Sequence, residues 1–223
     1  MAETAELVKS HHRRIVTAEV DVRDYPSLKA ALDGGVEQLG RLDVVLADAG
    51  IENGGTRLDK LGEDRSRAMI DINLTGVGHT VKAAVPHLMS SGRGGSIVVI
   101  SSVGGRKAYP HTGHYVTAQH GVIGLMRAFA VELGPLLIRV DSVLPTQVST
   151  PMAMNDQTFR QFAQHKQNPG PEDFAPISPM MHTLPVPWVE PADISNPVLF
   201  FASDESRYAT GVPLPVDAGS MLK

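Results

Sequence analysis

"GGSIVVISSVGG" (residues 94–105) carries the pattern that decides the fold of this chain. Its short β-branched run predicts a strand over 96–101, and small polar residues follow at 101–105. Runs of the same kind alternate with amphipathic segments along the chain, which is typical of parallel βαβ units. Ligands bind beyond the carboxyl ends of such strands, so the serine cluster at 101–105 is a candidate site.

Four further strands are expected, at 14–22, 42–47, 138–144 and 212–217. Two apolar stripes at helical spacing predict amphipathic helices between them. The first stripe contains Val77, Val81, Ala84, Val85 and Leu88, and the second contains Val122, Leu125, Met126, Phe129, Ala130 and Leu133. Gly134 and Pro135 are expected to end the second helix. The predicted fold class is therefore α/β, with a doubly wound parallel sheet.

The composition excludes several classes of function for this chain. With 223 residues, 42% hydrophobic and 20% charged, the chain is expected to form one domain over 1–223. A net charge of -4, without a long run of one sign, argues against nucleic acid or an anionic membrane as partner. The absence of cysteine excludes disulfides and thiolate zinc sites. Neither an apolar run of ~18 residues nor a secretory segment is found, so a cytoplasmic location is expected.

Residues 151–191 interrupt the alternation with a stretch rich in Met, Phe and Pro. A long irregular loop of this kind in a compact domain is usually a lid or a binding loop. Its segments "PMAMNDQTFRQF" and "SPMMHTLPVPW" would line a substrate lid with apolar side chains. The alternative is that the same side chains pack a contact between subunits.

Polar residues also follow the other expected strands. Asp21 follows the first, "DAG" (48–50) the second, and "PTQVSTP" (145–151) the fourth, which predicts one continuous cleft. A further pair stands in "GHYVTAQHG" (113–121), where Tyr115 and Gln119 lie one turn apart if this stretch opens a helix.

In their order and spacing, these stretches resemble the short-chain dehydrogenase/reductase family, and within it the mycofactocin-associated branch that includes carveol dehydrogenase-like proteins. The matching stretches are "EVDVRD", "GRLDVVLADAG", "DINLTGV", "GGSIVVISSVGG", "AYPHTGHY", "HGVIGLMRAFAVELGP", "TLPVPWVEPADISN" and "TGVPLPVDAGS". The resemblance implies a Rossmann-like sheet. It also implies hydride transfer between a nicotinamide cofactor, NAD or else NADP, and a small apolar secondary alcohol or ketone.

The resemblance assigns three members of the family's catalytic Asn-Ser-Tyr-Lys tetrad to Asn73, Ser102 and Tyr115. Tyr115 would exchange a proton with the substrate oxygen, while Ser102 hydrogen-bonds the same oxygen. Asn73 would hold a water in the proton path. Asp21 would meet the adenine ring, and Val148 and Thr150 the nicotinamide carboxamide. The full set implied for the cofactor is Asp21, Val22, Asp48, Ala49, Gly50, Tyr115, Gln119, Pro145, Val148 and Thr150.

Three departures from the family pattern bear on activity. Gln119 stands where the family has its lysine, so no ammonium lowers the pKa of the Tyr115 phenol. Alcohol oxidation should then lose base catalysis, while ketone reduction should suffer less. Asp48 and Asp141 stand where asparagine is usual. Each must find donors or have a raised pKa, unless Asp48 simply caps the following turn.

The third departure concerns the phosphate cradle. The family begins with a strand, a glycine-rich turn and a helix, and nothing before residue 14 matches them. The chain is therefore expected to be truncated at the N-terminus and to bind the cofactor poorly. The strands at 14–22 and 42–47 are then expected to pair directly through a crossover helix within 30–41, the other outcome being an exposed edge.

Two functions follow as alternatives. The first is an oxidoreductase of impaired activity, and the second is a non-catalytic truncated relative that retains oligomerisation surfaces. A homo-oligomer, dimer or tetramer, is expected through the helices that carry the two apolar stripes. His111 and His114 are the closest histidine pair with plausible spacing, but they lie in a loop matched by the family, so no metal site is expected.

Overall fold

A single parallel sheet organises the chain, whose computed structural model describes residues 2–163 and 166–223. Its strands are β1 (Val44–Ala47), β2 (Gly95–Ile100), β3 (Ile138–Pro145) and β4 (Pro213–Val216). They lie in the order β1-β2-β3-β4, and the register places Ile97 between Val45 and Val140. Four of the five predicted strands are thereby confirmed.

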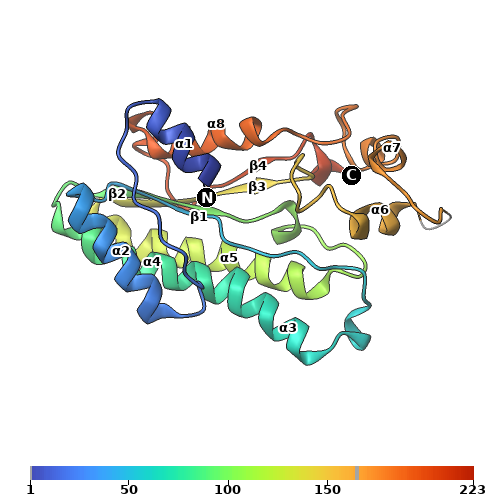
Figure 1. The fold of residues 1–223 in the computed structure, drawn as a ribbon, viewed down its shortest axis with the longest axis horizontal. Coiled ribbons are helices and arrows are strands. Elements are labelled where there is room, and N and C mark those ends of the chain that lie inside the picture. The colour runs from blue at the N-terminus through green and yellow to red at the C-terminus, as the bar shows by residue number, and fades with distance from the viewer. Residues whose placement is uncertain (1, 164–165) are drawn as a thin grey trace.

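Helices cover both faces of this sheet, as the doubly wound prediction requires (Figure 1). α4 (Gly76–Ser90) and α5 (Gly113–Leu133) cover one face, and α8 (Pro191–Ala202) covers the other. On the α8 side, Phe201 packs against Val98 and Val143. The predicted end of α5 is confirmed, since a 3-10 turn begins at Gly134.

The two apolar stripes lie in the core. Most of their residues are buried against the sheet, and Val85, Leu125 and Phe129 are partly buried beside them. Residues at this spacing lie on one side of a helix, so they are buried together when that side packs on the sheet. Most stripe residues therefore pack against the sheet, and self-association through the helices that carry them stays a prediction.

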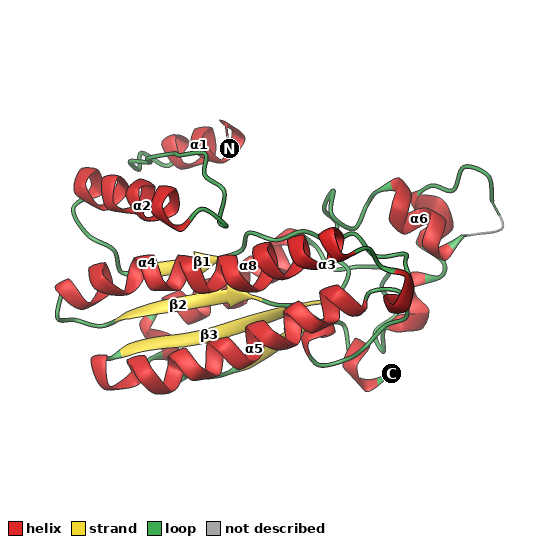
Figure 2. Ribbon diagram, turned by 90° about the horizontal axis from the view of Figure 1, so that it is seen from below, coloured by secondary structure: helices red, strands yellow, loops and turns green. Residues whose placement is uncertain are grey.

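The remaining helical segments complete the outer parts of the molecule. Figure 2 shows α1 (Ala2–Ser10) and α2 (Tyr25–Leu39) beyond the β1 edge of the sheet. α3 (Glu63–Ile70) continues through a π-helix (Asp71–Thr75) into α4, and α6 (Asp156–Phe162) and α7 (Pro171–Phe174) lie in the predicted lid. The 3-10 turns are Leu58–Lys60, Val103–Gly105, Gly134–Leu136, Ser178–Met181, Asp204–Ser206 and Ser220–Leu222. Among the described residues, no helix has the length and apolar composition that a membrane crossing requires.

The predicted strand at 14–22 is absent from the sheet, and its predicted pairing with 42–47 is wrong. Both ends of this segment are tied to helices. The Arg14 guanidinium donates to the carbonyls of Gln38 and Leu39 at 3.0 Å, and His79 Nδ1 donates to the Val22 carbonyl at 2.9 Å. The segment is therefore held along α2 and α4 and cannot run beside β1.

β1 is consequently an edge strand in the described structure, the second of the two predicted outcomes. The outward side chains of Val44 and Leu46 are 39% and 47% exposed. α2 is nevertheless held in place, because the His87 Nε2 of α4 lies 2.7 Å from Asp33 Oδ1. The β1 edge thus has no strand beside it in the described structure, although α2 follows segment 14–22 and is long enough for the predicted crossover.

The predicted lid at 151–191 is partly helical and has its own aromatic core, residues 164 and 165 lying outside the described residues. Phe174 is fully buried, with its ring centroid 4.9 Å from Phe162 and 6.1 Å from Trp188. Met152 and Met180 are exposed. The aromatic residues therefore hold the segment together, a use that the sequence pattern did not predict.

Asp141 is a fully buried carboxylate in the middle of β3. Its Oδ1 accepts from the Val212 N–H at 3.0 Å, but Oδ2 has no hydrogen bond in the described structure. Arg139 Nη1 stands 3.9 Å from Oδ2 and donates to Ser206 instead. Burial raises the pKa of Asp141, more than the Val212 bond and the Arg139 charge lower it, as the sequence predicted.

We expect Asp141→Asn to stabilise the protein at neutral pH by about 1 kcal/mol, because it removes a poorly paired buried charge and keeps the acceptor for Val212. A pKa raised on folding means that ionisation of Asp141 destabilises the folded state as pH rises through that window. The gain should accordingly disappear below about pH 4, where the carboxyl is protonated in both states. Urea unfolding as a function of pH measures it.

The matched control is Asp43→Asn, since the carboxylate of Asp43 forms exposed pairs with Arg41 and Arg93. That change should alter the unfolding free energy by less than about 1 kcal/mol. A gain in Asp141→Asn that is absent at neutral pH, or present equally in acid, contradicts the interpretation.

Candidate active site

The carboxyl ends of the parallel strands bring the predicted polar clusters to one edge of the sheet. Residues 48–50 follow β1, Ser101 and Ser102 follow β2, and Thr146 follows β3. Because parallel strands all end on the same side, segments far apart in sequence meet there.

Tyr115 is the centre of the polar group at this edge. It lies on the first turns of α5, with Gln119 one turn further along the helix. The side chains of Ser102 and Gln119 lie close to the phenol of Tyr115, and both lower its pKa. Ser102 is itself fixed, since its Oγ accepts from the Gly104 N–H at 3.0 Å. Three of the four predicted catalytic residues are thus brought together.

The phenol is held in its neutral form. Burial raises the pKa of Tyr115, and the negative charge of Glu52 raises it further. The polar side chains of Ser102 and Gln119 lower the pKa, but only in part. An amide offers no charge to favour the phenolate, so Tyr115 is a proton donor and a poor base near neutral pH.

Gln119 presents an unused acceptor beside this phenol. The side chain is buried, and its Oε1 has no hydrogen-bond partner in the described part of the chain. A buried amide oxygen without a partner needs an explanation, and a ligand hydroxyl would supply the missing donor. The sugar hydroxyls of a dinucleotide fit that requirement.

Asn73 lies on the π-helix between α3 and α4, a type of distortion that is frequent at functional sites. Its side chain is buried, and among the described residues it bonds only Ile51: Oδ1 accepts from the N–H at 2.9 Å and Nδ2 donates to the carbonyl at 2.8 Å. The predicted role as a water ligand therefore meets a side chain already committed to the turn that follows β1.

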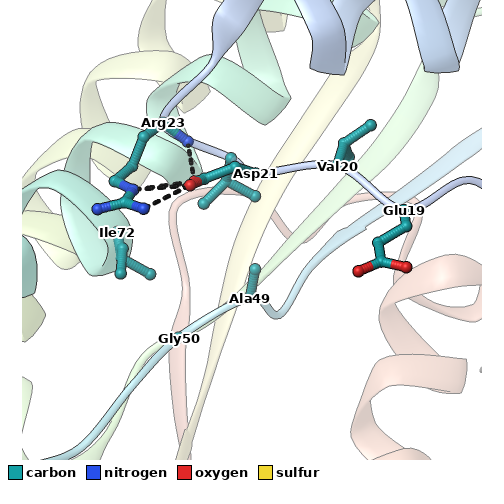
Figure 3. Close-up of a pocket in the computed structure, with 8 residues that line it drawn as sticks. Glu19, Val20, Asp21, Arg23, Ala49, Gly50 and Ile72 are labelled. Atoms are coloured by element: carbon teal, nitrogen blue, oxygen red, sulfur yellow. Dashed lines mark hydrogen bonds and ion pairs between the residues drawn. The ribbon is translucent and has the colours of Figure 1, made fainter.

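A pocket of about 890 Å³ opens beside this turn. It is lined by Glu19, Val20, Asp21, Val22, Arg23, Ala49, Gly50 and Ile72 (Figure 3). Four predicted cofactor residues, Asp21, Val22, Ala49 and Gly50, are thus brought together. The carboxylate of Asp21 binds the Arg23 guanidinium at 2.5 Å, which holds the pKa of Asp21 at about 2.

Asp48 lies beside this pocket and is exposed as a residue, yet neighbouring atoms partly desolvate its carboxyl and raise its pKa. This agrees with the predicted shift. The alternative, that Asp48 caps the following turn, finds no support, since no hydrogen bond to its carboxylate is found among the described residues.

Pro145, Val148 and Thr150 stand on the loop after β3. Pro145 is the last residue of β3, and Val148 forms an isolated bridge with Val189. The Thr150 N–H donates to the Val148 carbonyl at 2.7 Å. The structure places these residues at the same edge of the sheet, but on a loop that is separate from the Tyr115 group.

Sequence reasoning missed several polar residues here. Glu52 influences the Tyr115 phenol, and His114 Nε2 lies 2.7 Å from Asn53 Oδ1. Arg65 and Gln157 donate to the carbonyl of Gly54. For Glu52, Asn53 and His114, a place shortly after β1 or beside Tyr115 is the signal that could have drawn attention to them. Arg65 and Gln157 lie on α3 and α6 and carry no such signal.

Comparison with known proteins agrees with this arrangement. The profile of the family described as enoyl-(acyl carrier protein) reductase matches residues 1–221. A putative short-chain type dehydrogenase/reductase of Mycolicibacterium smegmatis is 65% identical over 100% of this chain and 80% of its own. The (-)-trans-carveol dehydrogenase of Rhodococcus erythropolis is 49% identical over 99% of this chain and 80% of its own.

Two solved structures extend the comparison. Carveol dehydrogenase from Mycobacterium avium, in complex with NAD, superposes with a TM-score of 0.98 at 72% identity, covering 100% of this chain and 80% of that one. A short-chain dehydrogenase from Mycobacterium paratuberculosis bound to NAD gives a TM-score of 0.89 at 41% identity, with the same coverage. The fold class is thereby confirmed.

We expect Asn73→Ala to destabilise the protein by about 2 kcal/mol, because it leaves the N–H and C=O of Ile51 without partners. The matched control is Asn196→Ala on the exposed face of α8, which should change the unfolding free energy by less than about 0.5 kcal/mol. Denaturant unfolding compares the two. Equal effects in both variants contradict a structural role for the Asn73 amide.

Proposed function

Because this chain belongs to the short-chain dehydrogenase/reductase family, we propose that it transfers a hydride between NAD and the carbinol carbon of a small apolar secondary alcohol or the matching ketone. The observation that carries the proposal is the grouping of Ser102, Tyr115 and Gln119 at the carboxyl edge of the sheet. That group offers two hydroxyls for one substrate oxygen, as reduction of a carbonyl requires.

The choice of NAD is supported by the residues and by the NAD complexes of the two similar structures. Asp21, Val22, Ala49 and Gly50 would hold the adenosine end, since they line one pocket. Gln119 Oε1 would accept from a ribose hydroxyl, and Val148 and Thr150 would face the carboxamide. Bound in this way, the cofactor supplies or accepts the hydride. NADP is the alternative.

For reduction, the chain's own residues would handle the oxygen of the substrate. Tyr115 donates its phenolic proton to the carbonyl oxygen as the carbinol forms, and Ser102 donates a hydrogen bond to the same oxygen. Proton resupply then needs a water. Because the Asn73 side chain is committed to Ile51, that water would be held by main-chain carbonyls of the π-helix.

We propose that reduction is the better direction for this chain. At neutral pH an unassisted phenol is ionised in only about one molecule in a thousand, and burial lowers that fraction further. Alcohol oxidation needs the phenolate as base and so loses a factor of ~10²–10⁴. Reduction uses the neutral phenol that burial already favours.

We also propose weak cofactor binding by this polypeptide. Gly50 is the one glycine that lines the described pocket, so the glycine-rich cradle expected for a pyrophosphate is not among its walls. Asp48 adds negative charge near the pocket, and the Asp21 carboxylate is already paired with the Arg23 guanidinium. Each of these features opposes a dinucleotide, and together they support impaired activity.

The substrate and assembly proposals rest on different surfaces. An apolar alcohol or ketone fits the name of the carveol dehydrogenase relative and the apolar character of residues 151–191. Self-association, as a dimer or tetramer, would use the exposed end of α5 and the turn after it, where Val131 and Leu137 are 79% and 72% exposed.

The experiment that tests the function measures ketone reduction with NADH and alcohol oxidation with NAD as a function of pH. We expect reduction to be flat between about pH 6 and 8, and oxidation to rise by about tenfold per pH unit without a plateau below about pH 10. Tyr115→Phe should lower both by ~10²-fold or more.

An oxidation plateau near neutral pH contradicts the proposed direction, and equal rates in Tyr115→Phe contradict the catalytic role of Tyr115. NADH binding is followed in parallel through Trp188, the single tryptophan. Absence of NADH binding at millimolar concentration would favour the alternative, a non-catalytic relative.

Gln119→Lys alone should not restore strong alcohol oxidation. The ammonium lowers the pKa of Tyr115, but the cofactor pocket keeps the deficits described above. We expect kcat for oxidation to stay below ~1 s⁻¹ with NAD and a panel of cyclic alcohols. The uncharged control Gln119→Met should gain nothing over the wild type. Oxidation by Gln119→Lys in the ordinary range of ~1–10³ s⁻¹ refutes the expectation.

A further inference from the structure

The first turn of α5 carries Tyr115, yet the start of this helix has no side-chain cap. The N-cap residue Thr112 makes no capping hydrogen bond, and its Oγ1 donates instead to the Tyr109 carbonyl at 3.0 Å. Gly113 follows at the first helical position. An uncapped helix end frays readily, because its first N–H groups lack partners. Some other contact must therefore hold Tyr115 in place.

His114, the neighbour of Tyr115, provides that contact. Its side chain is only 2% exposed, and its Nε2 donates to Asn53 Oδ1 at 2.7 Å. We propose that His114 is a positioning residue, which anchors the first turn of α5 to the loop after β1 and so fixes the Tyr115 hydroxyl. This inference rests on the proposed function, in which Tyr115 gives its proton to the substrate.

Asn53 is a rigid anchor because its own main chain is held. The Arg65 guanidinium of α3 donates to the carbonyls of Asn53 and Gly54. Gln157, on the lid helix α6, donates to the Gly54 carbonyl at 3.0 Å. An imidazole bound to Asn53 is thus tied to α3 and α6 as well as to β1.

The loop also packs tightly against the start of α5. The Gly55 N–H donates to the His111 carbonyl at 3.0 Å. A Cβ added at Gly54 would lie 3.0 Å from Thr112 Cγ2 and 2.8 Å from Glu52 Oε1, so the space is closed to any larger residue. Loop 52–55 therefore has little freedom to follow a displaced helix end, and the His114 bond is a fixed distance constraint.

His114 positions Tyr115 and does not exchange protons with it. Burial lowers the pKa of His114, and the nearby positive charge of Arg65 lowers it further. Nδ1 is buried without a hydrogen-bond partner in the described structure, so protonation there would leave an unpaired buried donor. The imidazole is therefore neutral, with its one N–H given to Asn53.

The same anchor controls the charge that faces Tyr115. Glu52 precedes Asn53 directly, its Oε1 accepts from the Gly54 N–H at 2.8 Å, and its charge acts on the phenol. Ser102 and Gln119 face the phenol from the turn after β2 and from α5 itself. Loss of the His114 bond would let α5 move relative to Glu52 and Ser102, and would let more water reach the phenol.

The test titrates the Tyr115 phenol by tyrosinate absorbance, with Tyr115→Phe spectra subtracted because the chain has four tyrosines. In His114→Ala the Tyr115 pKa should fall toward ~10, the value of a solvated phenol. His114→Gln can still donate to Asn53 and should titrate like the wild type. The matched control is His120→Ala, an exposed histidine on the same helix.

Turnover adds a second readout. Reduction by His114→Ala should lose about 10²-fold in kcat with little change in KM, the effect of a ~1 Å misplacement, and His114→Gln should restore it. A His114→Ala variant that titrates like the wild type overturns the inference, even if it is less stable. Should His114→Ala fail to fold, Asn53→Ala removes the acceptor and must lower the Tyr115 pKa in its place.

Failure of the proposed function gives a different result. If the wild type shows no turnover while the Tyr115 titration moves in His114→Ala and not in His114→Gln or His120→Ala, the positioning role stands and the catalytic role of Tyr115 fails. If turnover is normal and the Tyr115 titration is unchanged in both His114→Ala and Asn53→Ala, the catalytic role of Tyr115 stands and the positioning role of His114 fails.

Discussion

The parallel pairing of β2 with β1 and β3 is the constraint on which the rest of the structure depends. It places the end of every strand at the same edge, so that Ser102, the 48–50 turn and the loop after β3 meet although they are far apart in sequence. The helices then pack their apolar stripes against the faces of this sheet. A strand-end site is therefore a consequence of the sheet, and its chemistry is decided by a few side chains on α5 and on the loop after β1.

Those side chains lack one feature that a site needs in order to accept a proton at neutral pH. Among the described residues, no positive charge stands beside the phenol of Tyr115 to favour its ionised form. Gln119 supplies an uncharged amide with an unused acceptor, while burial and Glu52 favour the neutral form of Tyr115. Charge and desolvation thus act in the same direction. An active site built in this way gives protons more readily than it takes them.

The sequence predicts the sheet well because β2, β3 and the two long helices are specified by strong local patterns. The Ser102, Tyr115 and Gln119 group is also predictable, since helical spacing and strand-end position fix their geometry. The segment 14–22 fails for a physical reason: β propensity is local, but a strand needs a partner, and Arg14 and Val22 are bound to helices. The roles of Asn73 and His114 depend on tertiary hydrogen bonds to Ile51 and Asn53, which no local pattern encodes.

The central claim is that Tyr115 is a neutral acid, held so by burial beside an uncharged glutamine. The most direct measurement is the ultraviolet difference spectrum between the wild type and Tyr115→Phe as a function of pH, in the absence of substrate. The account predicts that Tyr115 stays largely un-ionised at about pH 10, where an ordinary phenol is half ionised. A tyrosinate signal that titrates near neutral pH would contradict it.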